Sequence, residues 1–180
     1  MKNALVLFAD GSEELEAVTV INILRRGGVN VTLAGLHGGA LRGSRGTVLQ
    51  PDTTLDEALE HSYDMVVLPG GQPGASNLGA DARVIKLVQH MAAEGRYVSA
   101  ICAAPSVLAT AGLLDGKRAT SFPGSLDAFP KVSRQPQAVV EDGKLITSRG
   151  PGTAMDFALT LLERLAGKAK RDEVEAGLVR

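Results

Sequence analysis

The chain has a single cysteine, no tryptophan and only 3% aromatic residues. One cysteine cannot form an internal disulfide bond, so nothing in the sequence indicates an oxidising compartment. The scarcity of aromatic side chains argues against a platform on which nucleic-acid bases stack. Nineteen basic and twenty acidic residues give a net charge of −1, which removes the electrostatic basis for sequence-specific nucleic-acid binding or for an anionic membrane surface.

Long apolar runs are also absent from the sequence. The apolar run at residues 4–9 is too short for the core of a signal peptide or for a membrane-spanning helix. We therefore expect a cytoplasmic protein without membrane contact. The 44% hydrophobic and 22% charged content, over 180 residues, predicts one ordinary globular domain that spans 1–180.

Short apolar runs alternate with helix-like segments along the chain. Strands are expected at 4–9, 30–36, 47–52, 63–71 and 97–101, with a hairpin over 138–148. Helices are expected at 12–28, 81–95, 103–114 and 151–168. The first of these would have Ser12 as its N-cap, and the last would have Pro151 near its first turn. This alternation predicts a flavodoxin-like three-layer α/β/α sandwich with a mostly parallel central sheet.

In such sheets the functional crevice lies beyond the carboxyl ends of the strands. Three segments follow predicted strands and compete for this position. They are ADGSEELE (9–16), LPGGQPGA (68–75) and AICAAP (100–105). We expect all three to meet at one edge of the sheet.

Cys102 lies where a predicted strand ends and a predicted helix begins. If Pro105 occupies the first turn of that helix, the helix starts at Ala103 or Ala104 and Cys102 sits in the turn before it. The positive end of the helix dipole would then lower the pKa of the thiol and favour the thiolate. The alternative is an inert, buried cysteine that acts as a small core hydrophobe.

Three acidic residues, Glu13, Glu14 and Glu16, occupy the first turn of the first predicted helix. Acidic residues stabilise helix N-termini, and this effect alone can explain them. The functional alternative is that one of them faces the crevice and shares a proton with Cys102. Such a carboxyl would be pushed towards its protonated form and could act as a general acid or base.

Other candidate motifs are weaker. The Gly-rich PGGQPGA loop can present backbone N–H groups to an oxyanion, but it lacks the G-x-G-x-x-G and P-loop patterns of nucleotide sites. In SRGPGTA, Arg149 is available for a carboxylate or a partner subunit. The histidines His37, His61 and His90 follow no metal-ligand spacing and offer no evident base for Cys102, so no metal site is expected.

Four blocks together, GSEELEAV, VVLPGG, AICAAP and SRGPGTAMDFAL, resemble the signature set of the ThiJ/PfpI (DJ-one) superfamily. They resemble most closely the DJ-one branch and its bacterial YajL-like relatives. The resemblance runs from about Ala4 to Lys168, with the blocks in the same order. It implies a flavodoxin-like fold, usually a homodimer, with a reactive cysteine at a nucleophile elbow.

The resemblance also implies roles for individual residues. Cys102 matches the reactive cysteine, and Glu16 matches the glutamate whose protonated side chain hydrogen-bonds the sulfur. Gly71 and Ala103 match the backbone N–H donors that face it. A further set is assigned to the pocket or the dimer interface: Glu13, Arg45, Gly70, Arg149 and Pro151.

Two positions depart from patterns within the superfamily. Its protease-like members carry His directly after the cysteine, where this chain has Ala103, which argues against a peptidase. Relatives in the DJ-one branch have a His-Pro pair near the pocket, aligned here with Phe122-Pro123. Glu16 is then the sole evident proton carrier.

The resemblance implies a cofactor-independent glyoxalase that converts methylglyoxal or glyoxal, and a deglycase activity on glycated proteins or nucleotides. Its class would be a hydro-lyase or hydrolase with a cysteine nucleophile, with a role in carbonyl and oxidative stress. The alternative is a non-enzymatic redox sensor or chaperone that acts through oxidation of Cys102. A peptidase is the weakest of the three hypotheses.

Overall fold

The computed structural model describes residues 1–180, and its centre is a seven-stranded sheet in the order β10-β11-β7-β6-β1-β2-β5. The strands are β1 (Asn3–Phe8), β2 (Asn30–Gly35), β5 (Thr53–Thr54), β6 (Met65–Leu68), β7 (Tyr97–Ile101), β10 (Val139–Asp142) and β11 (Leu145–Ser148). Neighbouring strands run parallel except β10, which is antiparallel to β11. The predicted flavodoxin-like fold with a mostly parallel sheet is confirmed.

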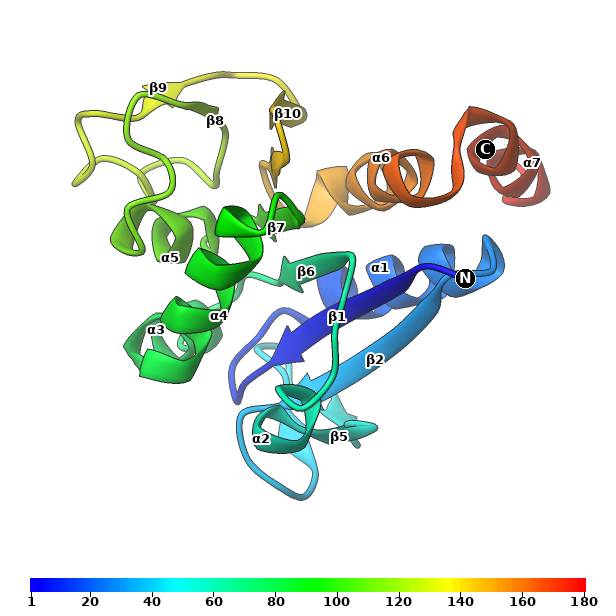
Figure 1. Ribbon diagram of the computed structural model, residues 1–180, viewed down its shortest axis with the longest axis horizontal. Coiled ribbons are helices and arrows are strands. Elements are labelled where there is room, and N and C mark those ends of the chain that lie inside the picture. The colour runs from blue at the N-terminus through cyan, green and yellow to red at the C-terminus, as the bar shows by residue number, and fades with distance from the viewer.

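Helices cover both faces of this sheet (Figure 1). They are α1 (Glu14–Arg26), α2 (Leu55–Ala58), α3 (Gly74–Ala80), α4 (Ala82–Ala93), α5 (Pro105–Thr110), the 3-10 turn η1 (Pro151–Thr153), α6 (Ala154–Ala166) and α7 (Lys168–Gly177). Helix α1 packs on α6, whereas α3, α4 and α5 pack together on the opposite face (Figure 1). None of the helices combines the length and apolar character needed to cross a bilayer.

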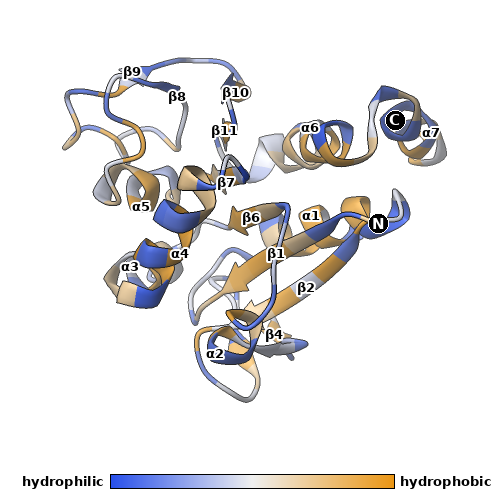
Figure 2. Cartoon of the chain, viewed as in Figure 1, coloured by the Kyte–Doolittle hydropathy of each residue, from blue (hydrophilic) through white to orange (hydrophobic).

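Strand β1 shows why the core has two halves. Successive side chains of a strand point to opposite faces. Leu5 and Leu7 accordingly belong to the apolar cluster beneath α4 and α5, and Val6 and Phe8 to the cluster beneath α1 and α6. All four are fully buried, and Figure 2 shows the central strands as hydrophobic. Burial on both faces explains the continuous apolar run that predicted a parallel strand.

Several local expectations need correction. The N-cap of α1 is Glu13, not Ser12, and Ser12 Oγ instead accepts a hydrogen bond from the amide of Ala9 at 3.0 Å. Helix α5 begins at Pro105, two residues later than the earliest expected start. Of the predicted strand at 47–52 only β4 (Val48–Leu49) forms, paired with β3 (Leu41–Arg42), which was not expected; β5 begins at Thr53, outside the predicted range.

Other elements were not anticipated. They are α2, α3, α7 and the small pair β8 (Arg118–Ala119) and β9 (Ser133–Arg134). Each is short or has too few apolar residues to give a periodic pattern. The hairpin strands β10 and β11 and the strand β7 lie where they were predicted.

Two phenylalanines allow the core to be tested against a matched surface change. Phe157 in α6 is fully buried, whereas Phe122 is 50% exposed. We expect Phe157→Ala to lower the free energy of unfolding by about 3–5 kcal/mol, because it leaves a cavity in the core. Phe122→Ala should change it by less than about 0.5 kcal/mol. Urea denaturation measures both values, and equal losses would contradict this assignment of the core.

Candidate active site

Cys102 lies in a strained turn between β7 and α5. Its φ angle is +65°, a left-handed conformation that non-glycine residues rarely adopt. Its amide donates to the carbonyl oxygen of Ser148 at 3.0 Å, and its carbonyl oxygen accepts the amide of Phe122 at 2.8 Å. A positive φ held by hydrogen bonds on both sides is the geometry of a nucleophile elbow, and a passive core cysteine does not require it.

The Gly-rich loop after β6 packs directly against this elbow. A Cβ atom added to Gly70 would lie 2.5 Å from the Cβ atom of Cys102 and 2.9 Å from the nitrogen of Ala103. Gly71 has a φ of +81°, and a Cβ there would lie 2.5 Å from the nitrogen of Glu13. Glycine is therefore required at both positions, because the loop fits between the elbow and the start of α1.

The start of α1 completes the site. The amide of Glu13 donates to the carbonyl oxygen of Gly70 at 2.8 Å. Glu16 has no exposed surface, and its Oε2 accepts the amide of Gly70 at 2.7 Å. The three segments that follow β1, β6 and β7 thus meet at the carboxyl edge of the sheet, which confirms that prediction.

The electrostatics of Glu16 follow from its burial. Burial raises the pKa of Glu16 to about 7, and the negative charge of Glu13 adds to this rise. The hydrogen bonds from Gly70 and from the Cys102 thiol lower the pKa, but burial outweighs them. Glu16 Oε1 is buried and has no hydrogen-bond partner. A carboxyl with this pKa can both accept and return a proton near neutral pH.

The pKa of Cys102 moves in the opposite direction to the one expected from the helix dipole. Burial, the negative charge of Glu16 and the hydrogen bond to its carboxylate together raise the pKa of Cys102 to about 12. The N–H groups of Gly71 and Ala103 oppose this rise. The prediction of a low-pKa thiolate failed because α5 is short and Cys102 is only 8% exposed. The thiol and Glu16 therefore compete for a proton as a coupled pair.

Glu13 and Arg45 lie next to this pair, in a layer further from the sulfur. Glu13 Oε2 accepts a hydrogen bond from Ser44 Oγ at 2.8 Å, and Arg45 Nε lies 3.8 Å from the same oxygen. Arg45 is 81% exposed along its side chain, so its charge is largely screened by solvent. Ser44 was not predicted, because a serine in a Gly-rich stretch carries no distinguishing signal.

Arg149 and Pro151 follow Ser148 in the chain, and it is Ser148 that contacts the elbow. Ser148, which receives the amide of Cys102, immediately precedes Arg149. The guanidinium of Arg149 donates to the carbonyl oxygen of Pro136 at 3.0 Å, and Pro151 is exposed at the start of η1. Phe122, at the position where some relatives have histidine, contributes its amide to Cys102.

His37 lies closer to the site edge than the sequence indicated. It follows β2 by two residues, at the carboxyl edge of the sheet, and its Nε2 lies 3.1 Å from Asp10 Oδ2. Asp10 precedes Gly11, whose backbone packs against Pro73 so closely that a Cβ would lie 2.4 Å from it. The ring of His37 is exposed, and its hydrogen-bonding partners are Asp10 and Gly38.

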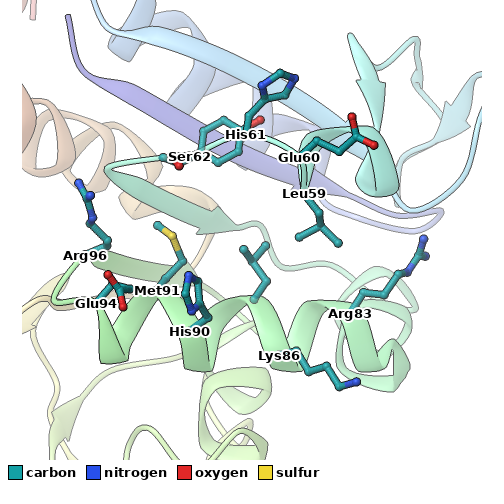
Figure 3. A pocket seen from close by; sticks show the side chains of 12 residues that line it. Leu59, Glu60, His61, Ser62, Arg83, Lys86, His90, Met91, Glu94 and Arg96 are labelled. Carbon is teal, nitrogen blue, oxygen red and sulfur yellow. The ribbon is translucent and has the colours of Figure 1, made fainter.

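A cavity of about 480 Å³ lies elsewhere, between the α2–β6 connection and α4 (Figure 3). Its apolar lining comes from Leu59, Tyr63, Leu87 and Met91. Figure 3 shows His61 and Lys86 directed away from its centre, so its polar groups do not converge on one point. In the whole chain, no three His, Cys, Asp or Glu side chains lie close enough to hold a metal ion.

Known proteins resemble this chain in both sequence and structure. The sequence profile of the DJ-1/PfpI family matches residues 2–164. Protein dj-1beta of Drosophila melanogaster is 45% identical over 183 residues, covering 99% of this chain and 97% of that protein. The crystal structure of Drosophila melanogaster DJ-1beta superposes with a TM-score of 0.95 at 46% identity, covering 99% of this chain and 97% of that one. Glutathione-independent glyoxalase DJR-1.2 of Caenorhabditis elegans is 32% identical over 176 residues, covering 96% and 94% of the two chains.

The coupling between Glu16 and Cys102 can be tested by titration. We expect Glu16→Gln to lower the pKa of Cys102 from about 12, because the substitution removes the neighbouring negative charge. The ultraviolet absorbance of the thiolate as a function of pH measures this value. Glu60→Gln, a change to an exposed carboxylate, should leave the curve unmoved. An unchanged titration in Glu16→Gln would show that the two groups are not coupled.

Proposed function

The chain belongs to the DJ-1/PfpI family, and from that premise we propose that it is a cofactor-independent glyoxalase with Cys102 as nucleophile and Glu16 as proton carrier. The observation that carries this proposal is the buried Glu16 carboxyl, with a pKa of about 7, beside a thiol in a strained elbow. A relative at 32% identity is named as a glutathione-independent glyoxalase. The proposed substrates are methylglyoxal and glyoxal.

The first step requires the thiol proton to leave as the sulfur attacks. Glu16 accepts this proton while the sulfur of Cys102 forms a bond to the aldehyde carbon. The carbonyl electrons move to oxygen, where the N–H groups of Gly71 and Ala103 stabilise the developing charge. Protonation of that oxygen gives a hemithioacetal.

The second step is an internal redox rearrangement. Glu16 removes the proton from the carbon bonded to sulfur and a proton is returned to the neighbouring keto carbon, so the first carbon is oxidised and the second reduced. The product is a thioester of Cys102. Water then attacks the thioester, releases the hydroxyacid, lactate in the case of methylglyoxal, and regenerates the thiol. No external oxidant is needed.

The same pair favours an enzyme over a redox sensor. Oxidation by peroxide requires a standing thiolate, whereas the pKa of Cys102 is raised to about 12. In the proposed reaction the thiolate forms only as Glu16 takes its proton. Deglycation of protein or nucleotide adducts would use the same nucleophile. The peptidase hypothesis receives no support, because Ala103 and Phe122 stand at the two positions where other members of the superfamily carry histidine.

Turnover of methylglyoxal tests this proposal. We expect Cys102→Ala to abolish lactate formation and Glu16→Gln to lower kcat by about 100-fold or more, because each removes a group that reacts directly. Glu173→Gln, at an exposed carboxylate of α7, is the matched control and should retain full activity. Lactate is quantified directly. A wild-type protein that forms none above background would overturn the proposal.

We also propose that the protein is a homodimer through an apolar patch beside this site. The patch consists of Leu15, Val18 and Val48, which are 50%, 44% and 51% exposed. Leu15 and Val18 are three residues apart on α1 and so share one face. The hydrogen bond from the amide of Thr47 to Glu14 brings the adjacent Val48 to the same turn of the helix. Exposed apolar clusters of this kind are typical of interfaces.

A charged substitution in the patch tests the dimer. We expect Leu15→Glu to give a monomer, because a carboxylate would be buried against its symmetry mate. Leu59→Glu, at another exposed leucine, should leave the oligomeric state unchanged. Light scattering coupled to size exclusion measures both masses. A monomeric wild type, or dissociation in both variants, would contradict the proposed interface.

A further inference from the structure

Glu14 lies between the proposed catalytic pair and a separate loop, and neither the family resemblance nor the proposed reaction gives it a role. It is only 8% exposed, although it is a charged residue in the first turn of a helix. Its carboxylate turns away from Cys102 and Glu16 towards the segment 43–47, which joins β3 to β4. A simple helix-dipole role would leave such a side chain in solvent.

The segment 43–47 is held by this carboxylate. The amide of Arg45 lies 3.1 Å from both oxygens of Glu14, the amide of Thr47 lies 3.1 Å from Oε1, and Ser44 Oγ lies 3.3 Å from Oε2. Burial by itself raises the pKa of Glu14, but its own amide, the amides of Arg45 and Thr47 and the Thr47 side chain outweigh burial and lower the pKa overall. The bonds are charge-assisted and therefore stronger than neutral ones.

The segment 43–47 packs tightly against the side chain of Glu14. A Cβ atom on Gly43 would lie 2.5 Å from Glu14 Oε2, so the backbone passes directly over the carboxylate. The amide of Ser44 also donates to the carbonyl oxygen of Ser12 at 2.8 Å. Backbone N–H groups thus hold the loop against the start of α1, and two of them, those of Arg45 and Thr47, donate to the carboxylate of Glu14.

The position of the segment 43–47 determines which groups lie next to Glu13. Ser44 Oγ and Arg45 Nε both approach Glu13 Oε2, at 2.8 Å and 3.8 Å. The exposed guanidinium of Arg45 makes no other ion pair, so its place beside Glu13 depends on how its backbone is held. The charge of Glu13 in turn raises the pKa of Glu16, whereas the charge of Glu14 does not contribute to this rise.

We propose that Glu14 is a positioning residue of the Cys102 site, which fixes the segment 43–47 so that Ser44 and Arg45 stay against Glu13. Through this chain of contacts Glu14 controls how far the charge of Glu13 next to Glu16 is compensated, chiefly by the hydroxyl of Ser44, because solvent screens the exposed Arg45. The effect on turnover rests on the proposed function. The effects on loop order and on Cys102 reactivity do not, so the two can fail separately.

Glu14→Gln tests this role, because it keeps the size of the side chain and removes the charge. Its amide group would place N–H donors against the Ser44 hydroxyl or the Arg45 amide, which are themselves donors. We expect amide hydrogen exchange at Arg45 and Thr47 to accelerate by about tenfold or more, as the loss of hydrogen bonds to a charged acceptor predicts. We also expect the acid limb of Cys102 alkylation by iodoacetamide to move to higher pH, since Glu13 is then less compensated.

The control must separate positioning from general loss of stability. Leu165→Ala removes a buried side chain of α6, outside the site, and should lower the melting temperature without changing either readout. If methylglyoxal is turned over, Glu14→Gln should lower kcat more than it raises KM, because the effect reaches the reaction through the protonation of Glu16. Unchanged exchange at Arg45 and Thr47, an unmoved alkylation limb, or the same changes in Leu165→Ala would each overturn the proposal. Absence of turnover in the wild type would overturn only the proposed glyoxalase.

Discussion

The arrangement and the electrostatics of the site depend on the buried carboxyl of Glu16. Removing a carboxylate from water is costly unless it is protonated or hydrogen-bonded, and Glu16 has no exposed surface. The amide of Gly70 satisfies one oxygen, and the neighbouring thiol of Cys102 lowers the pKa of the carboxyl without offsetting its burial. The pKa values of the two groups therefore depend on each other, and burial raises both.

The backbone around this pair is arranged to keep the two groups together. The positive φ of Cys102 is tolerated because hydrogen bonds to Ser148 and Phe122 hold both sides of its peptide units. Gly70 and Gly71 fill a space in which any side chain would collide with the elbow or with α1. Strain in the turn and close packing of the loop have the same consequence, which is that the elbow is held in place against the start of α1.

The sequence was sufficient to predict the sheet, most of its helices and the meeting of three loops at one edge, because buried strands leave continuous apolar runs and parallel strands end together. It could not predict the thiol pKa, since that depends on burial and on the charge of Glu16, which are tertiary properties. Ser44 and the buried orientation of Glu14 were missed for a related reason. Their roles arise from contacts about thirty residues apart that leave no local pattern.

The central claim is that Glu16, and not Cys102, changes protonation near neutral pH. Carbon-13 NMR of the wild-type protein, labelled in the Glu carboxyl and the Cys β carbon, tests it most directly. The structure predicts that the Glu16 signal titrates at about pH 7 while the Cys102 signal stays that of a thiol. A Cys102 thiolate signal at neutral pH beside a Glu16 that titrates near its ordinary value of 4.5 would contradict the shared-proton mechanism.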